Sequence, residues 1–320
     1  MKKSLIALAA LATVSIASAQ STVTISGNMS AGMSSLSGVK TIAGLDTTNS
    51  NLLNFAMVED LGGGLKATAN IGIRFDVNQS AGSTVATSNF GKSTGDQFVE
   101  LSSATLGAVR VGTFTSYSAA PYSAFATWTT TATHNSTAAT SVNHVRYASP
   151  RINGFAVNLS SFTPFSTTAI GDATLKHGTQ VLATYVNGPL TVGYATTSYT
   201  ATQDTKEVVQ NTLDGSYDFK IAKLYVQTWD EKAALTGVTK NKGYGISADI
   251  PYQAFTFKVG MRKLDDATVL TTVTDRTSLG VTYALSKRTR VIALLANDET
   301  SRATTPVKST NTYLGLTHSF

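Results

Sequence analysis

Apolar and polar residues alternate along long stretches of this chain. From Thr22 to Ser34 the odd positions are apolar or small, and the even positions are mostly polar. The same alternation returns from Gly64 to Asn78 and recurs in shorter segments, the last of which ends at Phe320. Successive side chains of a β-strand point to opposite faces, so a period of two predicts two-faced strands and not amphipathic helices.

The connections between these segments alternate in length. Short connections rich in turn-forming residues lie near 59–63, 104–106, 150–153, 188–189, 219–220, 251–252 and 285–287. Longer polar stretches lie near 35–50, 79–95, 115–142, 164–177, 200–210, 231–241, 264–274 and 298–310. Seven short turns and eight long loops join sixteen strands. Because lipid cannot satisfy an open sheet edge, the pattern predicts an all-β fold, a 16-stranded antiparallel transmembrane β-barrel with short turns on the periplasmic side.

The first residues have the layout of a secretory signal. Lys2 and Lys3 precede an apolar stretch from Leu5 to Ile16, and small residues at 17–19 close it. This stretch is shorter than the roughly 20 residues that span a bilayer as a helix. We therefore expect residues 1–19 to be a cleaved signal peptide and residues 20–320 to form one barrel domain.

Composition excludes several other classes of protein. The net charge of +6 is spread along the chain without a Lys/Arg-rich run, so we expect no nucleic-acid partner. There is no cysteine, which excludes disulfides and thiolate metal sites. No cluster of His, Asp and Glu has the spacing of metal ligands, and we expect no metal and no cofactor.

Several segments follow the pattern of a known family, in that family's order and spread over the whole mature chain. They are the start at 1–24, Glu59 to Ala67, Arg146 to Pro150 with Gly154 and Phe155, Tyr283 to Thr289, and Gly315 to Phe320. Together they resemble the general porins of Gram-negative bacteria, which are trimeric outer-membrane proteins, and especially their beta-proteobacterial branch.

This resemblance implies an outer-membrane pore through which ions and small hydrophilic solutes diffuse passively. It also implies a homotrimer surrounded by outer-membrane lipid, and an assembly signal at the terminal Phe320. In similar porins the third loop folds into the barrel and narrows it. We expect the same of residues 115–142, with these constriction residues: Tyr117, Tyr122, Phe125 and Trp128.

In such a barrel the lipid face is apolar and the lumen face is polar. Continuing the alternation predicts a set of charged side chains that line the pore and set its selectivity through their fixed field. The predicted pore-lining residues are Lys66, Arg74, Asp76, Asp96, Glu100, Arg110, Arg146, Lys258, Arg262 and Arg276. The same reasoning adds Lys223, Asp214, Asp218 and Asp249.

The chain departs from the porins that it resembles at positions where they often carry arginine. Here those positions hold Leu52, Thr113 and Thr140, and Glu100 stands where the others often have glycine. We therefore expect mild ion selectivity and leave its sign open.

Three other interpretations stay open. One is a channel specific for a single solute, such as a sugar or a small organic anion. Another is an outer-membrane hydrolase, which needs a histidine beside a nucleophile. His318 belongs to the lipid-facing set, and the other histidines, His134, His144 and His177, lie in or beside long loops. No nucleophile elbow is present, so we expect no catalytic residues. A secreted β-solenoid or adhesin is a third alternative.

One segment breaks the alternation. The run 291–296 is apolar at every position, and we expect it to contact another subunit or a plug.

Overall fold

The chain forms one closed β-barrel in the computed structural model, which describes residues 21–36, 42–43, 51–75, 90–114, 143–163, 175–201, 207–234, 238–265, 275–300 and 307–320. The strands are β1 Thr22–Leu36, β2 Ile42–Ala43, β3 Asn51–Gly62, β4 Leu65–Phe75, β5 Phe90–Ser103, β6 Gly107–Thr113, β7 Asn143–Ala148, β8 Phe155–Thr163, β9 Leu175–Asn187, β10 Leu190–Ala201, β11 Glu207–Asp218, β12 Lys223–Ala234, β13 Val238–Tyr252, β14 Phe255–Asp265, β15 Asp275–Ala284, β16 Thr289–Thr300 and β17 Val307–Ser319. β2 is a two-residue strand beside β1, so the described part contains sixteen long strands, and the predicted barrel is confirmed.

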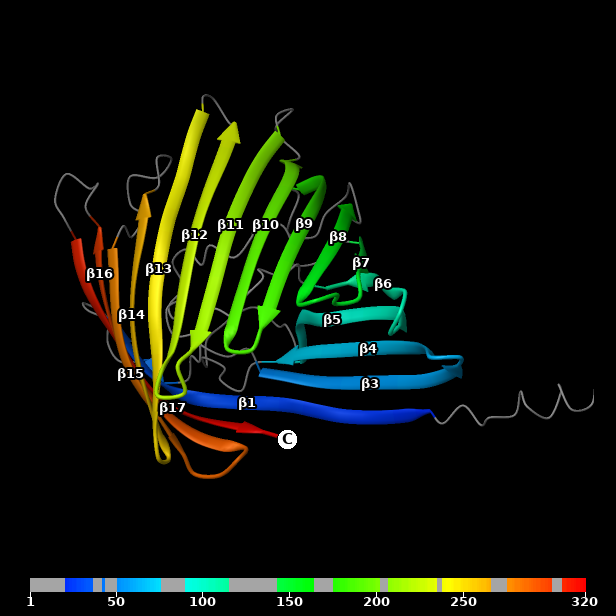
Figure 1. Ribbon diagram of the computed structural model, residues 1–320. Coiled ribbons are helices and arrows are strands. Elements are labelled where there is room, and N and C mark those ends of the chain that lie inside the picture. The colour runs from blue at the N-terminus through cyan, green and yellow to red at the C-terminus, as the bar shows by residue number, and fades with distance from the viewer. Residues whose placement is uncertain are drawn as a thin grey trace, which may run out of the picture.

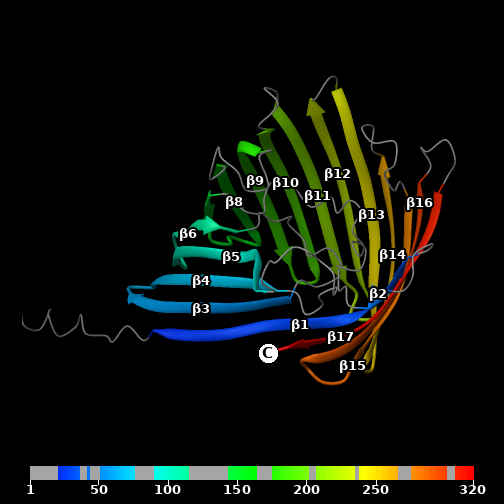
Figure 2. The same cartoon turned by 180° about the vertical axis from the view of Figure 1, so that it is seen from behind.

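The strands pair antiparallel with their neighbours in chain order, and the sheet closes on itself. The first part of β1 pairs with β3, where Thr22 lies opposite Val58. The second part pairs with β17, where Asn28 lies opposite Ser319. Figures 1 and 2 show the strands wrapping into one wall, with β9 to β13 rising steeply on one side. Closure pairs the first strand with the last, so their main-chain groups are hydrogen-bonded to each other.

The two faces of the wall differ in exposure, as the alternation predicts. In β14, Phe255, Phe257, Val259 and Met261 are exposed, whereas the side chains between them are less exposed, and Arg262 is buried. A closed barrel shields its inner face, so the exposed apolar face is the outer one. The core of this protein is therefore a largely polar inner wall.

The short connections lie where the sequence places them. Between β3 and β4 the chain turns at Gly62, Gly63 and Gly64, all three with φ between 62° and 80°. That left-handed conformation is accessible to glycine without steric cost. The other short turns join β5 to β6, β7 to β8, β9 to β10, β11 to β12, β13 to β14 and β15 to β16.

The long connections are shorter than predicted. The stretch 231–241 was expected to be a loop, yet β12 continues to Ala234 and β13 begins at Val238. Four other strands also begin inside stretches that were predicted to be loops: β5 at Phe90, β9 at Leu175, β11 at Glu207 and β17 at Val307. These strands extend beyond the apolar band, where both faces meet water and alternation no longer marks a strand. The inward fold predicted for residues 115–142 lies outside the described residues.

Candidate functional site

One row of charged side chains crosses the inner wall from β5 to β7. Glu100 lies opposite Arg110, and Arg110 lies opposite Arg146. Arg110 Nε donates to Glu100 Oε2 at 2.7 Å, and Arg146 Nη2 lies 4.0 Å from the same oxygen. The side chains are 14% to 17% exposed, so all three have limited access to the lumen. A single carboxylate thus faces two guanidinium groups.

Aromatic rings hold this row in place. The Arg110 guanidinium carbon lies 3.6 Å from the centroid of Phe98. Phe114 stacks on His144 at 4.0 Å between ring centroids, and Phe162 meets His144 edge-on. His144, which was expected in or beside a long loop, is the second residue of β7, and its side chain is fully buried. These rings restrict the guanidinium group of Arg110 to one orientation.

The polar row continues around the barrel through residues that the alternation pattern did not single out. From Arg146 the pairing runs to Ser160, Gln180, Thr197 and Gln210. Gln210 lies opposite Glu231 on β12, which is buried. Glu231 fell within a predicted loop. Continuing the period of two from Trp229 would have found it.

A second charge cluster lies on β12 to β14. Asp249 is opposite Lys223 on one side and Lys258 on the other. Lys258 Nζ donates to Asp249 Oδ2 at 2.6 Å. Asp218 lies opposite Lys223, so the two signs alternate from strand to strand. Fixed charges of alternating sign produce a field that largely cancels over a few ångströms.

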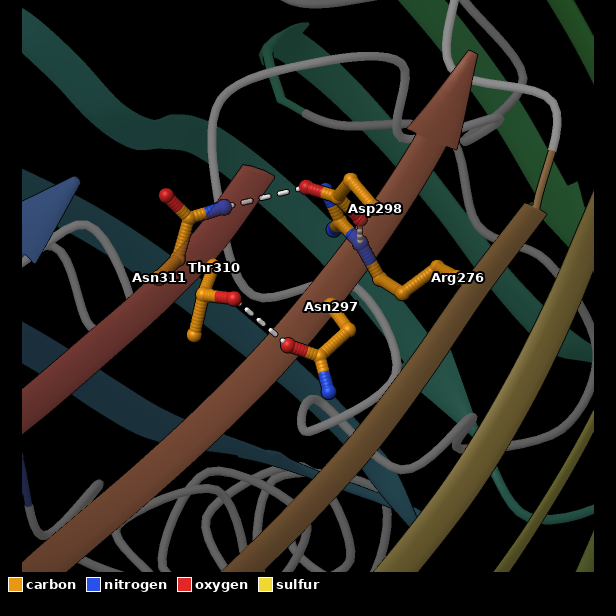
Figure 3. Close-up of polar contacts among 5 residues, drawn as sticks. All are labelled: Arg276, Asn297, Asp298, Thr310 and Asn311. Carbon is orange, nitrogen blue, oxygen red and sulfur yellow. Dashed lines mark hydrogen bonds and ion pairs between the residues drawn. The ribbon is translucent and has the colours of Figure 1, made fainter. Parts of the chain in front are cut away.

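A third cluster lies on β15 to β17 and is more deeply buried. Figure 3 shows Arg276 and Asn311 reaching Asp298 on β16 between them. Arg276 donates to Asp298 through Nε at 2.5 Å and through Nη2 at 2.8 Å, and Asn311 Nδ2 donates to Oδ2 at 3.0 Å. Arg262 on β14 lies opposite Arg276 and is also buried. Asp298 was missed because residues 298–310 were predicted to be a loop.

The other predicted pore residues lie outside these three charge clusters. Lys66 is exposed near the first turn, opposite Asp60. Arg74 is half-buried on the same face of β4 as Asn70, and Asp96 is half-buried on the face of β5 that carries Glu100. The residues Asp76, Tyr117, Tyr122, Phe125 and Trp128 lie outside the described part of the chain. Asp214 is buried on the inner face of β11 and accepts a hydrogen bond from Gln227.

Two of the three missing-arginine positions can be placed. Leu52 lies opposite Arg74 and shares its face with Asn54, which is hydrogen-bonded to Asn70 of the inner wall. Thr113 alternates with Phe114 and falls on the face of the exposed Val111, so an arginine there would not join Arg110. Thr140 lies outside the described residues.

The apolar run 291–296, for which we expected a contact with another subunit or a plug, divides between the two faces of β16, and that contact stays a prediction. Ile292, Leu294 and Ala296 face inward and form a buried cluster with Tyr313. Their three neighbours in the run are half-exposed on the outer face. The inward half cannot contact another barrel through lipid, because the barrel wall lies between. An aromatic and aliphatic cluster instead interrupts the polar inner wall here.

The C-terminal residue closes the barrel. The Phe320 main chain exchanges two hydrogen bonds with Gly27, at 3.1 and 3.0 Å, and its ring lies against Gly27. His318 is exposed on the outer face and lies 2.9 Å from the Thr289 hydroxyl. Within the described ranges no group of three His, Asp or Glu could hold a metal ion, and no helix is long and apolar enough to cross a membrane.

Known proteins share both the sequence pattern and this architecture. Residues 5–303 match the family described as Gram-negative porin. Outer membrane porin protein 32 of Delftia acidovorans is 29% identical over 331 residues, which cover 94% of this chain and 91% of that protein. The solved anion-selective porin from Comamonas acidovorans superimposes with a TM-score of 0.74 at 20% identity, covering 94% of this chain and 100% of that chain. The solved Salmonella typhi OmpF complex with daunomycin superimposes with a TM-score of 0.71 at 11% identity. The match covers 93% of this chain and 97% of that chain.

The solved structures support the fold, and the family match spans nearly the whole chain. An apolar outer face, a closed wall and a charged inner face are what a water-filled pore through a membrane requires. The chain therefore belongs to the Gram-negative porin family and forms an outer-membrane channel for passive diffusion.

Proposed function

We propose that this porin passes small hydrophilic solutes and ions of both signs with weak charge selectivity. One observation carries the proposal: the inner-wall charges occur as opposite-sign neighbours, Arg110 with Glu100, Lys258 with Asp249, and Arg276 with Asp298. Paired charges attract and repel a passing ion almost equally, so neither sign is strongly excluded.

The Comamonas structure is described as an anion-selective porin. In this chain the Glu100 carboxylate lies 2.7 Å from Arg110 and 4.0 Å from Arg146 and offsets part of their positive field. We propose that Glu100 makes the pore less anion-selective than the two arginines alone would make it. Its position on the inner face of β5, with 16% of its side chain exposed, supports this role.

Further parts of the proposal follow from the resemblance to porins. Residues 1–19 act as a cleaved signal peptide, and residues 20–320 form the mature barrel. Three barrels assemble as a homotrimer, and residues 115–142 narrow each pore with Tyr117, Tyr122, Phe125 and Trp128. Phe320 acts in assembly. The protein is not an enzyme and uses no cofactor.

Purified protein in planar bilayers tests the proposal. Stepwise conductance that rises in proportion to salt concentration, with a small reversal potential in a KCl gradient, is the expected result. Swelling of liposomes in a series of neutral sugars should depend on sugar size alone. Conductance that one solute blocks saturably would contradict unspecific diffusion and favour a substrate-specific channel.

A further inference from the structure

The inner wall at the short-turn end of the barrel carries an arginine that belongs to none of the charge clusters. Arg290 is the second residue of β16, directly after the turn from β15. It shares the inward face of β16 with the buried Ile292, yet its own side chain is exposed. An inward side chain that stays exposed at the end of its strand is open to the water of the lumen. Arg290 therefore lines one mouth of the pore.

Small neutral side chains surround Arg290 on the wall. It lies opposite Ala284 on β15 and Thr317 on β17. The Thr317 hydroxyl is hydrogen-bonded to the Ser30 hydroxyl of β1, at 2.9 Å between the two oxygens. The Arg290 side chain makes no hydrogen bond or ion pair with another residue that the structure describes. Its N–H donors are therefore available to water and to solutes.

The other cations of the inner wall near the short turns are balanced by carboxylates. Each of them lies opposite a carboxylate or shares one with a neighbour. The pairs are Lys66 with Asp60, Lys223 with Asp218, Lys258 with Asp249, and both Arg110 and Arg146 with Glu100. Arg290 differs from all of them, because neither residue opposite to it is charged.

The nearest inner-wall carboxylates among the described residues are three strands away on either side. They are Asp249 on β13 and Asp60 on β3. Adjacent strands are about 4.8 Å apart, so about 14 Å of wall separates Arg290 from each of them. The terminal carboxylate of Phe320 is nearer, three residues past Thr317 and about 10 Å along β17. Because charges are largely screened beyond about 10 Å in about 0.1 M salt, the positive field of Arg290 acts at this mouth without being cancelled.

We infer that Arg290 recruits small anions to the short-turn mouth and gives this mouth a preference for anions. The inference rests on the proposed weakly selective pore and names the residue that tips its balance. A guanidinium group binds carboxylate or phosphate oxygens through paired N–H donors, and it attracts chloride by its charge. At an exposed site such contacts are weak, so anions concentrate at the mouth and still move on into the pore.

A cysteine in place of Arg290 tests the inference, because the chain has no other cysteine. In planar bilayers between about 0.1 M and 0.01 M KCl, Arg290→Cys should lower the chloride-to-potassium permeability ratio about twofold. This is the effect of one charge about 10 Å from the path of the ion. A positively charged, water-soluble methanethiosulfonate should restore the wild-type ratio, and a negatively charged one should lower the ratio about twofold further. Arg290→Lys keeps the charge and should keep the ratio.

Lys308→Cys is the matched control, since Lys308 is an exposed lysine on the outer face of β17, beside Glu299. Both reagents should leave the permeability ratio of this variant unchanged. The inference is overturned if Arg290→Cys keeps the wild-type ratio, or if its thiol fails to react while the control thiol reacts. If both reagents change the ratio of Arg290→Cys alike, the bulk of the side chain and not its charge acts at the mouth, and the inference is wrong.

The direction of the salt gradient locates the charge along the pore. A fixed charge is screened less on the dilute side, where the Debye length is about 30 Å instead of about 10 Å. The loss in Arg290→Cys should therefore be larger when the dilute solution bathes the mouth from which the reagents react faster. Equal losses in both directions would place the charge in the middle of the pore and contradict the inference. Any of these failures leaves the proposed weak selectivity standing, because the paired charges that carry it do not include Arg290.

Discussion

Glu100→Gln tests the charge balance of the pore wall with a minimal change in shape. The amide occupies nearly the same volume as the carboxylate, and its oxygen can still accept the hydrogen bond from Arg110 Nε, now 2.7 Å long. What changes is the charge of the row, which loses its one negative group and keeps the guanidinium groups of Arg110 and Arg146. We expect the pore to become more permeable to anions.

The size of the effect follows from distance and screening. Removing the charge changes the electrostatic energy of an ion that passes about 7 Å away by about 0.6 kcal/mol in water. Screening reduces this change to about 0.3 kcal/mol in about 0.1 M salt. The sign of the change is opposite for K⁺ and Cl⁻. The permeability ratio should therefore shift about threefold toward chloride.

Reversal potentials between about 0.1 M and 0.01 M KCl measure this ratio. A threefold change in the ratio moves the reversal potential by about 20 mV, given about 59 mV per tenfold for a monovalent ion. Glu59→Gln is the matched control, because Glu59 is exposed on the outer face of β3, away from the pore. If Glu100→Gln moves the potential no more than this control, Glu100 does not set the selectivity of the pore.

Three further changes test what holds the barrel together. The first two are read as the temperature at which the folded form is lost in detergent gels, and the third as the folded fraction in outer membranes. Asp298→Ala leaves the Arg276 side chain, 1% exposed, without its carboxylate and should cost about 3–5 kcal/mol, whereas adding Arg276→Met should restore much of that stability. An unaltered transition would show that this ion pair is dispensable. Gly315→Ala places a Cβ against the hydroxyl end of the Tyr313 ring and should cost about 1–3 kcal/mol, with partial relief by Tyr313→Ala; wild-type stability would mean that the ring moves freely. Deleting Phe320 removes the two hydrogen bonds with Gly27 at the end of the β1–β17 seam and should reduce the folded fraction in outer membranes, so an undiminished fraction would argue against its role in assembly.

Much of the wall follows from local sequence. The alternation in 255–261 assigns the two faces of β14 correctly, because the period of two is a property of the extended backbone itself. The glycines at 62–64 mark the first short turn because few other residues adopt its left-handed φ. Apolar outer faces and tight turns together were enough to predict the barrel and its number of strands.

Strand ends and wall clusters were harder to predict. Above the bilayer both faces of a strand are wet, so Glu231 and Lys240 were predicted to be loop residues although they lie within β12 and β13. His144 was expected in or beside a long loop, and nothing near it in sequence predicts its burial. That burial depends on Phe114, directly after β6, and on Phe162 of β8.

The sequence by itself determined which side chains share a face, since that depends only on spacing along one strand. Tertiary structure alone decided which of them meet. Glu100 lies opposite Arg110, and Arg276 opposite Asp298, because the turns and the closure of the barrel fix the register between strands. Closure also decided that Leu294 points into the lumen and Leu295 out of it. Both residues are apolar, so no pattern along the chain distinguishes them.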